Sequence, residues 1–537
     1  MNEKSKRIDM PVNRLADVPA LKGKRLEFDS MAEMFTVRAG EIPEKKHVLY
    51  YGQEITYRQT NARANRVANY LKEKGVKKGD VVSIMIPNSP EIYYAMFGAQ
   101  KLGAIAGIIN FALKGPEIAH VLDDSKPKIV FVASEFMEFF SRAFEIASHR
   151  PVIVEVKTEK EHNFDIAEQT LSDILEKYPA DEALVPQAPS DPFLLLYSSG
   201  TTGLPKGILL SNQGQLNTCC GMATIGLVPT ENETMLVLLP MYHINPIGVW
   251  TYPLTFMGQT ICIRKAFSPA DFWPAIIENQ VTILMGVPAM YNYVYYSIDA
   301  SKIDMSNLKL KFAFSGAAPL SVDLIRGFKE KFNVEIIEGY GLTEAIGVSS
   351  VNPPMGKRKP GSCGLAMPGQ EIEIMDYDNK IVAAGEKGEV CIRGINTMIE
   401  YLNNPKATEE TLIDGWLHTG DIGYLDEEGF LYVIDRKKDM INRGGENIYP
   451  REIEIVLESH PEINAVAVVG VADEALGERV KAFIEPLEPG RLTGEMVKEY
   501  LKDKVAKYKV PEFIEIVESL PRNPTGKILK YELRKKD

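Results

Sequence analysis

The chain has 537 residues, of which 45% are hydrophobic and 25% are charged, and its formal net charge is −12. This length predicts two or more domains, and the composition is typical of a globular protein. The acidic balance gives no support for nucleic-acid binding, although a local basic pocket can still hold a small anion.

The N-terminus, the hydropathy and the cysteines indicate where the protein works. Residues 1–7 are charged and lack an apolar stretch, so we expect no secretory signal. No apolar run reaches the length that a membrane-spanning helix needs. The five cysteines are an odd number without C-x-x-C spacing, which fits a reducing compartment. We therefore expect a cytoplasmic protein.

Helix-like and strand-like segments alternate over the N-terminal third. Apolar residues recur at helical spacing in two segments, and short apolar runs between and after them are typical of buried strands. The helical segments are 60–74 and 90–102, and the strand-like runs are 80–86, 105–110, 128–132, 151–156 and 194–197. Such alternation predicts largely parallel sheets covered by helices.

The C-terminal segment has a different pattern. It predicts helices at 447–460 and 496–505 and strands at 463–471 and 482–485, which together make a small α+β unit. Just before it, the sequence VIDRKKDM (433–440) carries five charges at the end of a strand-like run. We place the boundary there, between domains of residues 1–436 and 437–537.

A loop rich in glycine and hydroxyl residues follows the predicted strand at 194–197. Glycines let backbone N–H groups approach a phosphate, hydroxyls donate hydrogen bonds, and lysine supplies positive charge. The spacing differs from the P-loop because proline precedes the lysine and no Ser or Thr follows it. The pattern favours phosphate binding over a flexible surface loop. The loop reads YSSGTTGLPKG, and its candidate residues are Ser198, Ser199, Gly200, Thr201, Thr202, Gly203 and Lys206.

This loop resembles the signature of the adenylate-forming superfamily, which includes acyl-CoA synthetases, luciferases and peptide-synthetase adenylation domains. Further motifs of that superfamily follow in the right order, and the resemblance extends from near Thr56 to Lys530. It implies an α/β fold with a large N-terminal domain of helix-flanked β-sheets, a small β-barrel-like subdomain and a small mobile α+β C-terminal domain. It also implies ATP, Mg²⁺, coenzyme A and a small carboxylic acid as ligands.

The segment EGYGLTEA, Glu338–Ala345, combines an aromatic residue between glycines with a threonine and a carboxylate. An aromatic ring can lie against a base, and the other two groups can hold a phosphate oxygen and a hard cation. Without the resemblance, a capped strand-to-helix turn is the simpler reading. The resemblance implies Tyr340 beside adenine, Thr343 at the α-phosphate and Glu344 on Mg²⁺. It assigns the rest of the nucleotide wall to Glu338, Gly339 and three residues of the SGAAP segment, Gly316, Ala317 and Ala318.

A second carboxylate lies in the turn HTGDIG (418–423). Asp421 there suits a ribose diol because a carboxylate accepts two hydrogen bonds, although aspartate is also common in surface turns. The resemblance implies that Asp421 binds the ribose hydroxyls and that Arg436 assists.

The segment PMYHINP (240–246) contains a lone histidine, His243. A lone histidine is more often structural than catalytic. The resemblance places His243 at the mouth of an acyl pocket as a gate or carboxylate contact, with Asn245 nearby. Gly341 stands where acetate-specific relatives carry tryptophan, so the resemblance implies a medium-chain, branched or cyclic acid rather than acetate.

The C-terminal motif NPTGKILK (523–530) contains Lys527, which could otherwise belong to a solvated basic tail. The resemblance implies that Lys527 is the adenylation lysine, whose charge binds the acid and the α-phosphate. It also implies a hinge at Lys438 and a coenzyme A loop of Gly444, Gly445 and Glu446. Acylation of Lys527 by a lysine acyltransferase, reversed by a deacylase, would remove that charge.

Together these residues predict an AMP-forming acyl-CoA synthetase whose C-terminal domain rotates between two half-reactions. The main alternative is an enzyme that loads the phosphopantetheine of a carrier protein; we expect no carrier domain, since the sequence ends at Asp537. Luciferase-like oxidation of the adenylate and a non-catalytic ATP or acyl sensor are further alternatives. The acid, the direction of flux and the oligomeric state stay open, with a homo-oligomer among the alternatives.

Overall fold

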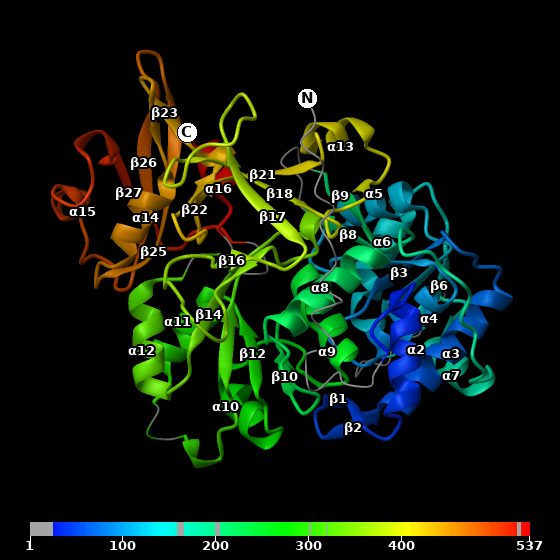
Figure 1. The fold of residues 1–537 in the computed structure, drawn as a ribbon. Coiled ribbons are helices and arrows are strands. Elements are labelled where there is room, and N and C mark those ends of the chain that lie inside the picture. The colour runs from blue at the N-terminus through cyan, green and yellow to red at the C-terminus, as the bar shows by residue number, and fades with distance from the viewer. Residues whose placement is uncertain are drawn as a thin grey trace, which may run out of the picture. The chain divides into compact units, whose positions relative to one another are not determined.

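The computed structural model describes residues 25–157, 166–198, 204–299, 301, 303–318, 320–522 and 528–536. The chain divides into two compact units, the first comprising Met1–Ile372 and Ile392–Leu417, the second Glu373–Cys391 and His418–Asp537. Both mix helices and strands, and the first is much the larger (Figure 1). The predicted α/β class, with a large and a small part, is confirmed.

The first unit contains an eight-stranded sheet in the order β19-β9-β8-β4-β3-β5-β6-β7. Strands β3 to β8 pair in parallel, whereas β9 and β19 add antiparallel neighbours at one edge. The central strands are continuous apolar runs, as expected where helices cover both faces of a parallel sheet. The strands are β3 (Val81–Met85), β4 (Ile105–Ile108), β5 (Ile129–Ala133), β6 (Val152–Val156), β7 (Gln169–Thr170), β8 (Pro192–Ser198), β9 (Lys206–Ser211) and β19 (Glu400–Tyr401).

Amphipathic helices pack against this sheet. The helix α3 begins with a capping box in which the Thr56 side chain accepts from the Gln59 backbone N–H, and Gln59 accepts from that of Thr56 in return. Its apolar face packs against α4, and a separate apolar cluster forms between β5, α5 and α6. The helices are α3 (Tyr57–Glu73), α4 (Glu91–Lys101), α5 (Gly115–Ser125), α6 (Met137–Ile146) and α7 (Leu171–Lys177).

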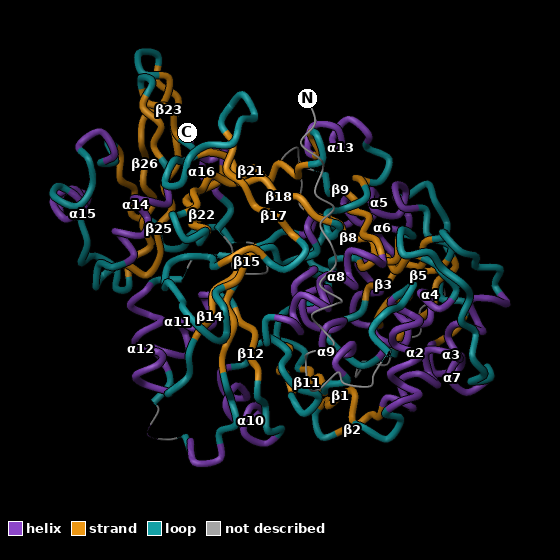
Figure 2. Tube along the Cα trace, viewed as in Figure 1, coloured by secondary structure: helices purple, strands orange, loops and turns teal. Residues whose placement is uncertain are grey.

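A nine-stranded sheet in the order β16-β15-β14-β13-β12-β10-β11-β1-β2 forms the other half of the first unit. Six of its strands, from β1 to β14 along the middle of that order, pair in parallel. The strands are β1 (Lys46–Tyr50), β2 (Gln53–Thr56), β10 (Thr234–Val237), β11 (Thr260–Ile263), β12 (Ile283–Gly286), β13 (Phe312–Ser315), β14 (Ile336–Tyr340), β15 (Ser350–Val351) and β16 (Leu365–Ala366). Figure 2 shows β14 and β15 next to each other.

Helices also cover this second sheet. Aromatic side chains of α10, α11 and α12 build its main apolar cluster, and α8 and α9 pack against each other between the two large sheets (Figure 1). A π-helical turn at Asn245–Thr251 leads directly into α9, a type of irregularity that is frequent at functional sites. The helices are α2 (Met31–Glu41), α8 (Asn212–Thr224), α9 (Tyr252–Met257), α10 (Pro269–Glu278), α11 (Pro288–Ser297) and α12 (Val322–Phe332).

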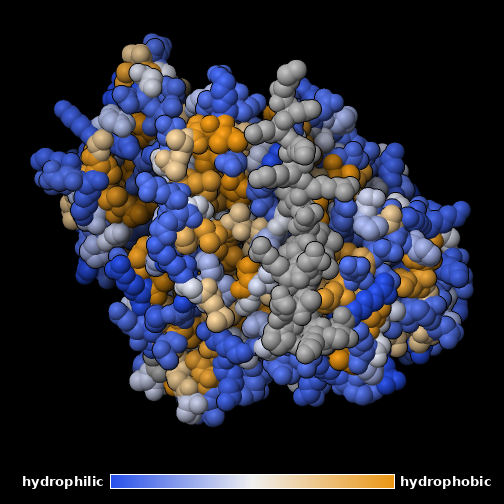
Figure 3. Space-filling view, viewed as in Figure 1, coloured by the Kyte–Doolittle hydropathy of each residue, from blue (hydrophilic) through white to orange (hydrophobic). Residues whose placement is uncertain are grey.

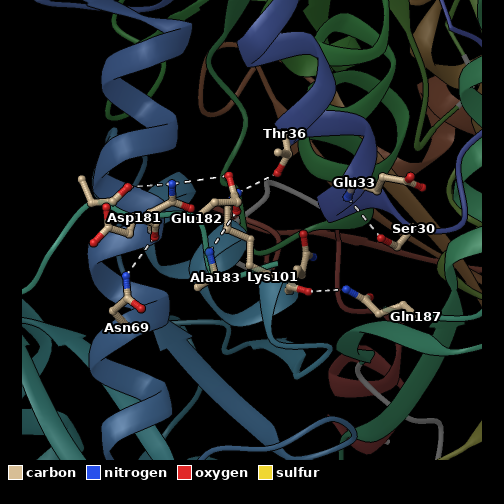
Figure 4. Close-up of polar contacts among 12 residues, drawn as sticks. Ser30, Glu33, Thr36, Asn69, Lys101, Asp181, Glu182, Ala183 and Gln187 are labelled. Atoms are coloured by element: carbon tan, nitrogen blue, oxygen red, sulfur yellow. Dashed lines mark hydrogen bonds and ion pairs between the residues drawn. The ribbon is translucent and has the colours of Figure 1, made fainter. Parts of the chain in front are cut away.

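Polar side chains fix the extended segment that leads into β8. The buried ammonium of Lys101 pairs with Glu182 at 2.7 Å and donates to the Thr36 hydroxyl (Figure 4). Asn69 on α3 donates to the Asp181 carbonyl. Burial lowers the pKa of Lys101, and the carboxylate of Glu182 opposes that shift. These contacts hold in place the segment that leads into β8, the strand that precedes the glycine-rich loop.

The boundaries of the two units fall within strands of a five-stranded sheet, in the order β17-β18-β21-β20 with β22 beside β21. These elements are β17 (Gln370–Met375), β18 (Gly388–Gly394), β20 (Leu412–Ile413), β21 (Trp416–Leu425), β22 (Leu431–Arg436) and the helix α13 (Pro405–Thr411).

The second unit is completed by another five-stranded sheet, β24-β23-β26-β25 with β27 beside β26, and three helices. The predicted helix at 447–460 begins only at Pro450, because Asn447 and Ile448 belong to β24, and the predicted strand at 482–485 extends over Gly477–Pro486. The elements are β23 (Ile441–Arg443), β24 (Glu446–Ile448), β25 (Ile463–Asp473), β26 (Gly477–Pro486), β27 (Phe513–Ile516), α14 (Pro450–Glu458), α15 (Gly494–Leu501) and α16 (Lys530–Leu533).

None of the five cysteines, all of which the structure describes, forms a disulfide, and only Cys363 is not buried. Burial raises the pKa of the Cys220 and Cys391 thiols to about 12 and that of Cys262 to about 11. The face in Figure 3 is mostly hydrophilic, with scattered apolar patches. Among the described residues, no helix combines the length and the apolar character that crossing a membrane demands.

Candidate nucleotide and acyl site

Two predicted nucleotide-wall segments leave neighbouring parallel strands. Ser315 at the end of β13 pairs with Glu338 in β14, so the residues after both strands emerge at the same edge of the sheet. Ligands of open α/β sheets bind at such carboxyl ends. A Cβ at Gly339 would lie 2.5 Å from the Phe314 ring, so only glycine fits there. Ala317 has φ +70°, a left-handed conformation that is strained for a residue with a side chain.

Glu338 joins the loops around this edge. Its Oε2 accepts a 2.9 Å hydrogen bond from the Gly361 backbone N–H, and the backbone at Leu320 contributes another. Burial raises the pKa of Glu338 to about 7 against the opposing effect of these two bonds. A carboxyl held by backbone amides can fix two loops at once without a cationic partner.

The glycine-rich loop connects β8 and β9, because Ser198 pairs with Lys206 across the antiparallel ladder. The five predicted phosphate contacts between them, Ser199, Gly200, Thr201, Thr202 and Gly203, lie outside the described residues. Their roles therefore stay predictions. The Lys206 ammonium lies 5.0 Å from the centroid of the Tyr401 ring, within the range of a cation–π contact.

The predicted metal ligand Glu344 lies in a short 3₁₀ turn, Thr343–Ala345. Its backbone carbonyl accepts from the Met398 N–H at 2.7 Å, and the next carbonyl, of Ala345, accepts from the Asn396 side chain at 2.9 Å. The Tyr401 hydroxyl donates to Glu344 Oε1 at 2.9 Å. Lys206, Tyr401 and Glu344 thus form one continuous chain of contacts within the first unit.

Tyr401 was not among the residues singled out from the sequence. It lies 57 positions after Glu344, and in the sequence it resembles any aromatic residue of a short strand. Burial and the Glu344 charge raise the pKa of Tyr401, so its hydroxyl stays a neutral donor. Only the pairing of β19 with β9 reveals its position, since that pairing brings it beside Lys206.

The described part of the chain fits a magnesium ion that is shared with a phosphate. Between residues 25 and 536, with the gaps given above, no three potential metal-ligating side chains gather. Mg²⁺ is usually held by one or two carboxylates together with water and substrate phosphates, so the single carboxylate of Glu344 is sufficient. Among the described residues, none donates to its Oε2, which leaves that oxygen for a cation.

The segment predicted to line the acyl pocket is largely buried. Among the described residues, His243 Nε2 and Asn245 Oδ1 have no hydrogen-bond partner although both atoms are buried. Burial lowers the pKa of His243 to about 4, so its imidazole is neutral at pH 7. The π-helical turn after it borders a narrow apolar gap that leaves no room for a water molecule, bounded by Met235, Val237, Leu238, Leu239, Pro246, Trp250 and Met285.

Gly341 has a local reason to be glycine. A Cβ there would lie 2.5 Å from the carbonyl oxygen of Gly347, so the backbone of the returning loop occupies that space. The Ile244 side chain in turn lies close to Gly347, which connects this loop with the segment around His243. The predicted effect of Gly341 on pocket depth stays a prediction.

The predicted ribose carboxylate belongs to the second unit. Asp421 pairs with Arg436 across β21 and β22, and their side chains form an ion pair at 2.6 Å with only 5% of the Asp421 side chain exposed. Glu389 supports the same turn: it accepts from the Gly420 N–H at 2.9 Å, forms an ion pair with Lys437 at 3.0 Å and lies 3.3 Å from the His418 Nδ1 atom. Glu389 was also missed, because a strand glutamate gives no distinguishing signal.

The remaining predicted residues also lie in the second unit. Lys438 is exposed in a 3₁₀ turn at Lys437–Asp439. Gly444 and Gly445 have φ +60° and +90° in the exposed two-residue turn between β23 and β24, which favours glycine at both positions. Lys527 lies outside the described residues; its described neighbour Ile528 pairs with Arg522.

Sequence comparison gives independent information on the family. Residues 35–402 match the model of the AMP-binding enzymes, and residues 452–527 match the model of the AMP-binding enzyme C-terminal domain. A long-chain-fatty-acid–CoA ligase of Mycobacterium tuberculosis is 34% identical, with 89% of this chain and 92% of that protein covered. A feruloyl-CoA synthase of an Amycolatopsis species is 33% identical, with 93% and 97% covered.

Solved structures of similar enzymes have the same fold. An anthranilate CoA ligase in complex with anthranoyl-AMP matches with a TM-score of 0.88 and 29% identity over 95% of this chain and 98% of that one. ATP-bound MatB from Rhodopseudomonas palustris matches with a TM-score of 0.86 and 27% identity over 95% and 99%. CoA ligases of this kind use ATP, Mg²⁺ and coenzyme A. The chain therefore belongs to the family of AMP-binding enzymes and is an acid–thiol ligase.

Proposed function

We propose that the chain joins a carboxylic acid larger than acetate to coenzyme A through an acyl-adenylate. The observation that carries this proposal is the contact chain from Lys206 through Tyr401 to Glu344. It supports a site where a lysine from the glycine-rich loop serves the same polyphosphate as a carboxylate whose Oε2 has no donor among the described residues. The relatives named above are CoA ligases, and no observation favours a carrier protein as acceptor.

In the first proposed step, a carboxylate oxygen of the acid attacks the α-phosphorus of ATP, and the bond to pyrophosphate breaks. Mg²⁺ held by Glu344 would neutralise phosphate charge. Thr343 would orient an α-phosphate oxygen, and Lys527 would bind both reacting anions. Asp421 and Arg436 would hold the ribose. In the second step the thiolate of coenzyme A attacks the adenylate carbonyl, and AMP leaves.

The two steps place different demands on the C-terminal domain. The first step needs Lys527. The second needs the pantetheine arm of coenzyme A, and we propose that the exposed turn at Gly444–Glu446 binds it. We therefore propose that residues 437–537 rotate about Lys438 between the steps. The exposure of Lys438 in a short turn supports this hinge.

The proposed acid is medium-chain, branched or cyclic. The apolar surroundings of Trp250, with Met235 and Met285 nearby, support an acid with a hydrocarbon body. His243 Nε2 and Asn245 Oδ1 are buried and have no hydrogen-bond partner within the described ranges, which supports a ligand that brings polar atoms of its own. Because its imidazole is neutral at pH 7, His243 would contact the carboxylate as a hydrogen-bond donor rather than as a cation.

Pyrophosphate release across a panel of acids, with and without coenzyme A, tests this function. The panel holds acetate, unbranched acids of six to ten carbons, branched acids and aromatic acids. We expect turnover with at least one class other than acetate, and thioester formed with free coenzyme A. Release with acetate alone would contradict the proposed acid class, and adenylate that never reacts with free coenzyme A would contradict the proposed acceptor.

The variant Lys527→Ala tests the separation of the half-reactions. We expect adenylate formation to fall roughly 10³-fold because a charge that stabilises the transition state is lost. Conversion of a chemically prepared acyl-adenylate to thioester should stay near the wild-type rate, measured by chromatography. Equal losses in both half-reactions would show that Lys527 does not act in the first step alone.

A further inference from the structure

Tyr401 lies in β19, beside both β9 and the short 3₁₀ turn that carries Glu344. Its backbone pairs with Ile208 in β9, and the next N–H, of Leu402, donates to the Gly207 carbonyl at 2.7 Å. Its own N–H donates to the Thr408 hydroxyl at 3.0 Å, and the residue is only 7% exposed. A side chain fixed by backbone bonds on both sides has little freedom to turn away from its partners.

From this position Tyr401 contacts two groups of opposite charge. The face of its ring receives the Lys206 ammonium, and its hydroxyl donates to one oxygen of the Glu344 carboxylate. The same segment binds the Glu344 backbone through the Met398 N–H, so both ends of Glu344 are oriented by residues 398–401. Partners of this type set the direction and basicity of a metal-binding carboxylate.

The chemical nature of the donor matters here. A cationic donor beside Glu344 would neutralise the carboxylate and compete with a metal ion, whereas a phenol fixes one oxygen and leaves the negative charge in place. Because the ring also binds Lys206, it keeps that ammonium apart from the carboxylate instead of letting the two form a direct ion pair. Both charges then stay available for a polyphosphate and its cation.

We propose that Tyr401 is a positioning residue for the metal–nucleotide complex: it orients Glu344 towards the divalent cation and Lys206 towards the phosphates. The proposal rests on the proposed role of Glu344, and it adds a residue that acts through both groups without contacting the reacting atoms. It predicts that removing the hydroxyl weakens metal-dependent nucleotide binding and leaves metal-independent nucleotide binding intact.

The test uses Tyr401→Phe, which keeps the ring beneath Lys206 and removes only the hydroxyl. Calorimetry gives the affinity of the full-length protein for α,β-methylene-ATP in the presence of Mg²⁺ and in the presence of EDTA. The ratio of the two affinities measures the contribution of the metal. We expect this ratio to fall roughly tenfold in the variant, in line with the loss of a group that orients a metal ligand. The affinity for AMP in EDTA should stay unchanged.

A matched control is present in the same unit. The Tyr178 hydroxyl donates to Glu73 Oε1 at 2.6 Å, and Tyr178 is 6% exposed, so it makes the same bond at similar burial. If Tyr401→Phe lowers the thermal stability, Tyr178→Phe should lower it to a similar extent. The ratio of the affinities with Mg²⁺ and with EDTA should stay unchanged in Tyr178→Phe. A fall in the ratio in both variants would overturn the proposal, since it would trace the effect to stability alone.

A double-mutant cycle separates positioning from general damage. Once Glu344→Gln has removed the carboxylate charge, adding Tyr401→Phe should have no further effect on the metal-dependent ratio. An unchanged ratio in the single Tyr401→Phe variant would overturn the proposal, as would equal losses of AMP and metal-dependent binding. The proposed function fails separately, if the wild-type protein binds the nucleotide with Mg²⁺ yet forms adenylate with no acid.

Discussion

The carboxylates proposed for the nucleotide site are held differently in the two units. In the first unit, Glu344 is bound by a phenol and Glu338 by backbone amides, and within the described ranges neither forms an ion pair. In the second unit, Asp421 pairs with Arg436, and Glu389 pairs with Lys437. This difference indicates where an external cation binds. Glu344 keeps its negative charge in the unit proposed to meet Mg²⁺, whereas the charges of Asp421 and Glu389 are neutralised in the unit proposed to meet the uncharged ribose.

The largest effect should come from removing the uncompensated charge of Glu344. Glu344→Gln keeps an acceptor for Tyr401 but loses the negative charge, so we expect acid-dependent pyrophosphate release to fall roughly 10³-fold. AMP binding in EDTA should not change. A variant that retains more than a tenth of the wild-type rate would show that the Glu344 carboxylate is not a metal ligand.

On the other side of the comparison, Asp421→Asn should raise the KM for ATP by roughly 10- to 100-fold, because a hydrogen bond to a charged acceptor is weakened. The wild-type protein should discriminate against 3′-deoxy-ATP, and the variant should not. Asp473→Asn removes another aspartate–arginine ion pair of the second unit, with Arg479, and serves as the control. If both variants change KM alike, the effect comes from stability and not from the ribose.

The carboxylate that supports Asp421 can be tested in the same way. Glu389→Gln keeps an acceptor for the Gly420 N–H and loses the ion pair with Lys437, whose side chain is partly exposed. We expect a decrease of about 1.5 kcal/mol in the free energy of unfolding, measured by urea denaturation at pH 7.5. No change would mean that the second unit does not depend on its paired charges.

The smallest expected effect concerns the pH dependence of stability through Glu338. Its pKa of about 7 in the folded protein lies above the ordinary value of 4.5, so the folded protein keeps a proton that the unfolded chain has lost. The stability that this group contributes is fully present below pH 4.5 and is lost as pH rises towards 7. Glu338→Gln should make this pH-dependent loss in the free energy of unfolding smaller by about 1 kcal/mol, a value that allows for the partial exposure of the side chain.

Urea denaturation at pH 5.0 and pH 7.5 measures this effect. The quantity to compare is the difference between the two pH values, because the substitution also removes a backbone partner at every pH. An identical pH slope in the two proteins would contradict a raised pKa for Glu338.

The sequence was most informative where a pattern lies within a single segment. The apolar runs predicted the parallel strands, and EGYGLTEA and HTGDIG gave Glu344 and Asp421 as candidates whose roles stay predictions. Tyr401 and Glu389 could not be found in this way, because their partners lie 57 and 29 or more positions away and only strand pairing brings them together. The start of α14 was placed three residues early because a helix-like pattern continued through β24.

Gly341 shows another limit of inference from sequence. A glycine in place of a bulky residue predicts a deeper pocket, and that effect stays a prediction. What the sequence could not show is the local constraint, since the carbonyl of Gly347 lies 2.5 Å from where a Cβ at position 341 would be.

The burial of the cysteines has a practical consequence for measuring the second half-reaction. Four of the five thiols are buried, and only Cys363 is partly accessible. A thiol reagent such as a disulfide chromogen reacts with exposed thiolates, so the folded protein should give a background close to one equivalent per chain. Consumption of free coenzyme A can therefore be followed directly by its colour reaction, without first replacing or blocking the protein's own cysteines.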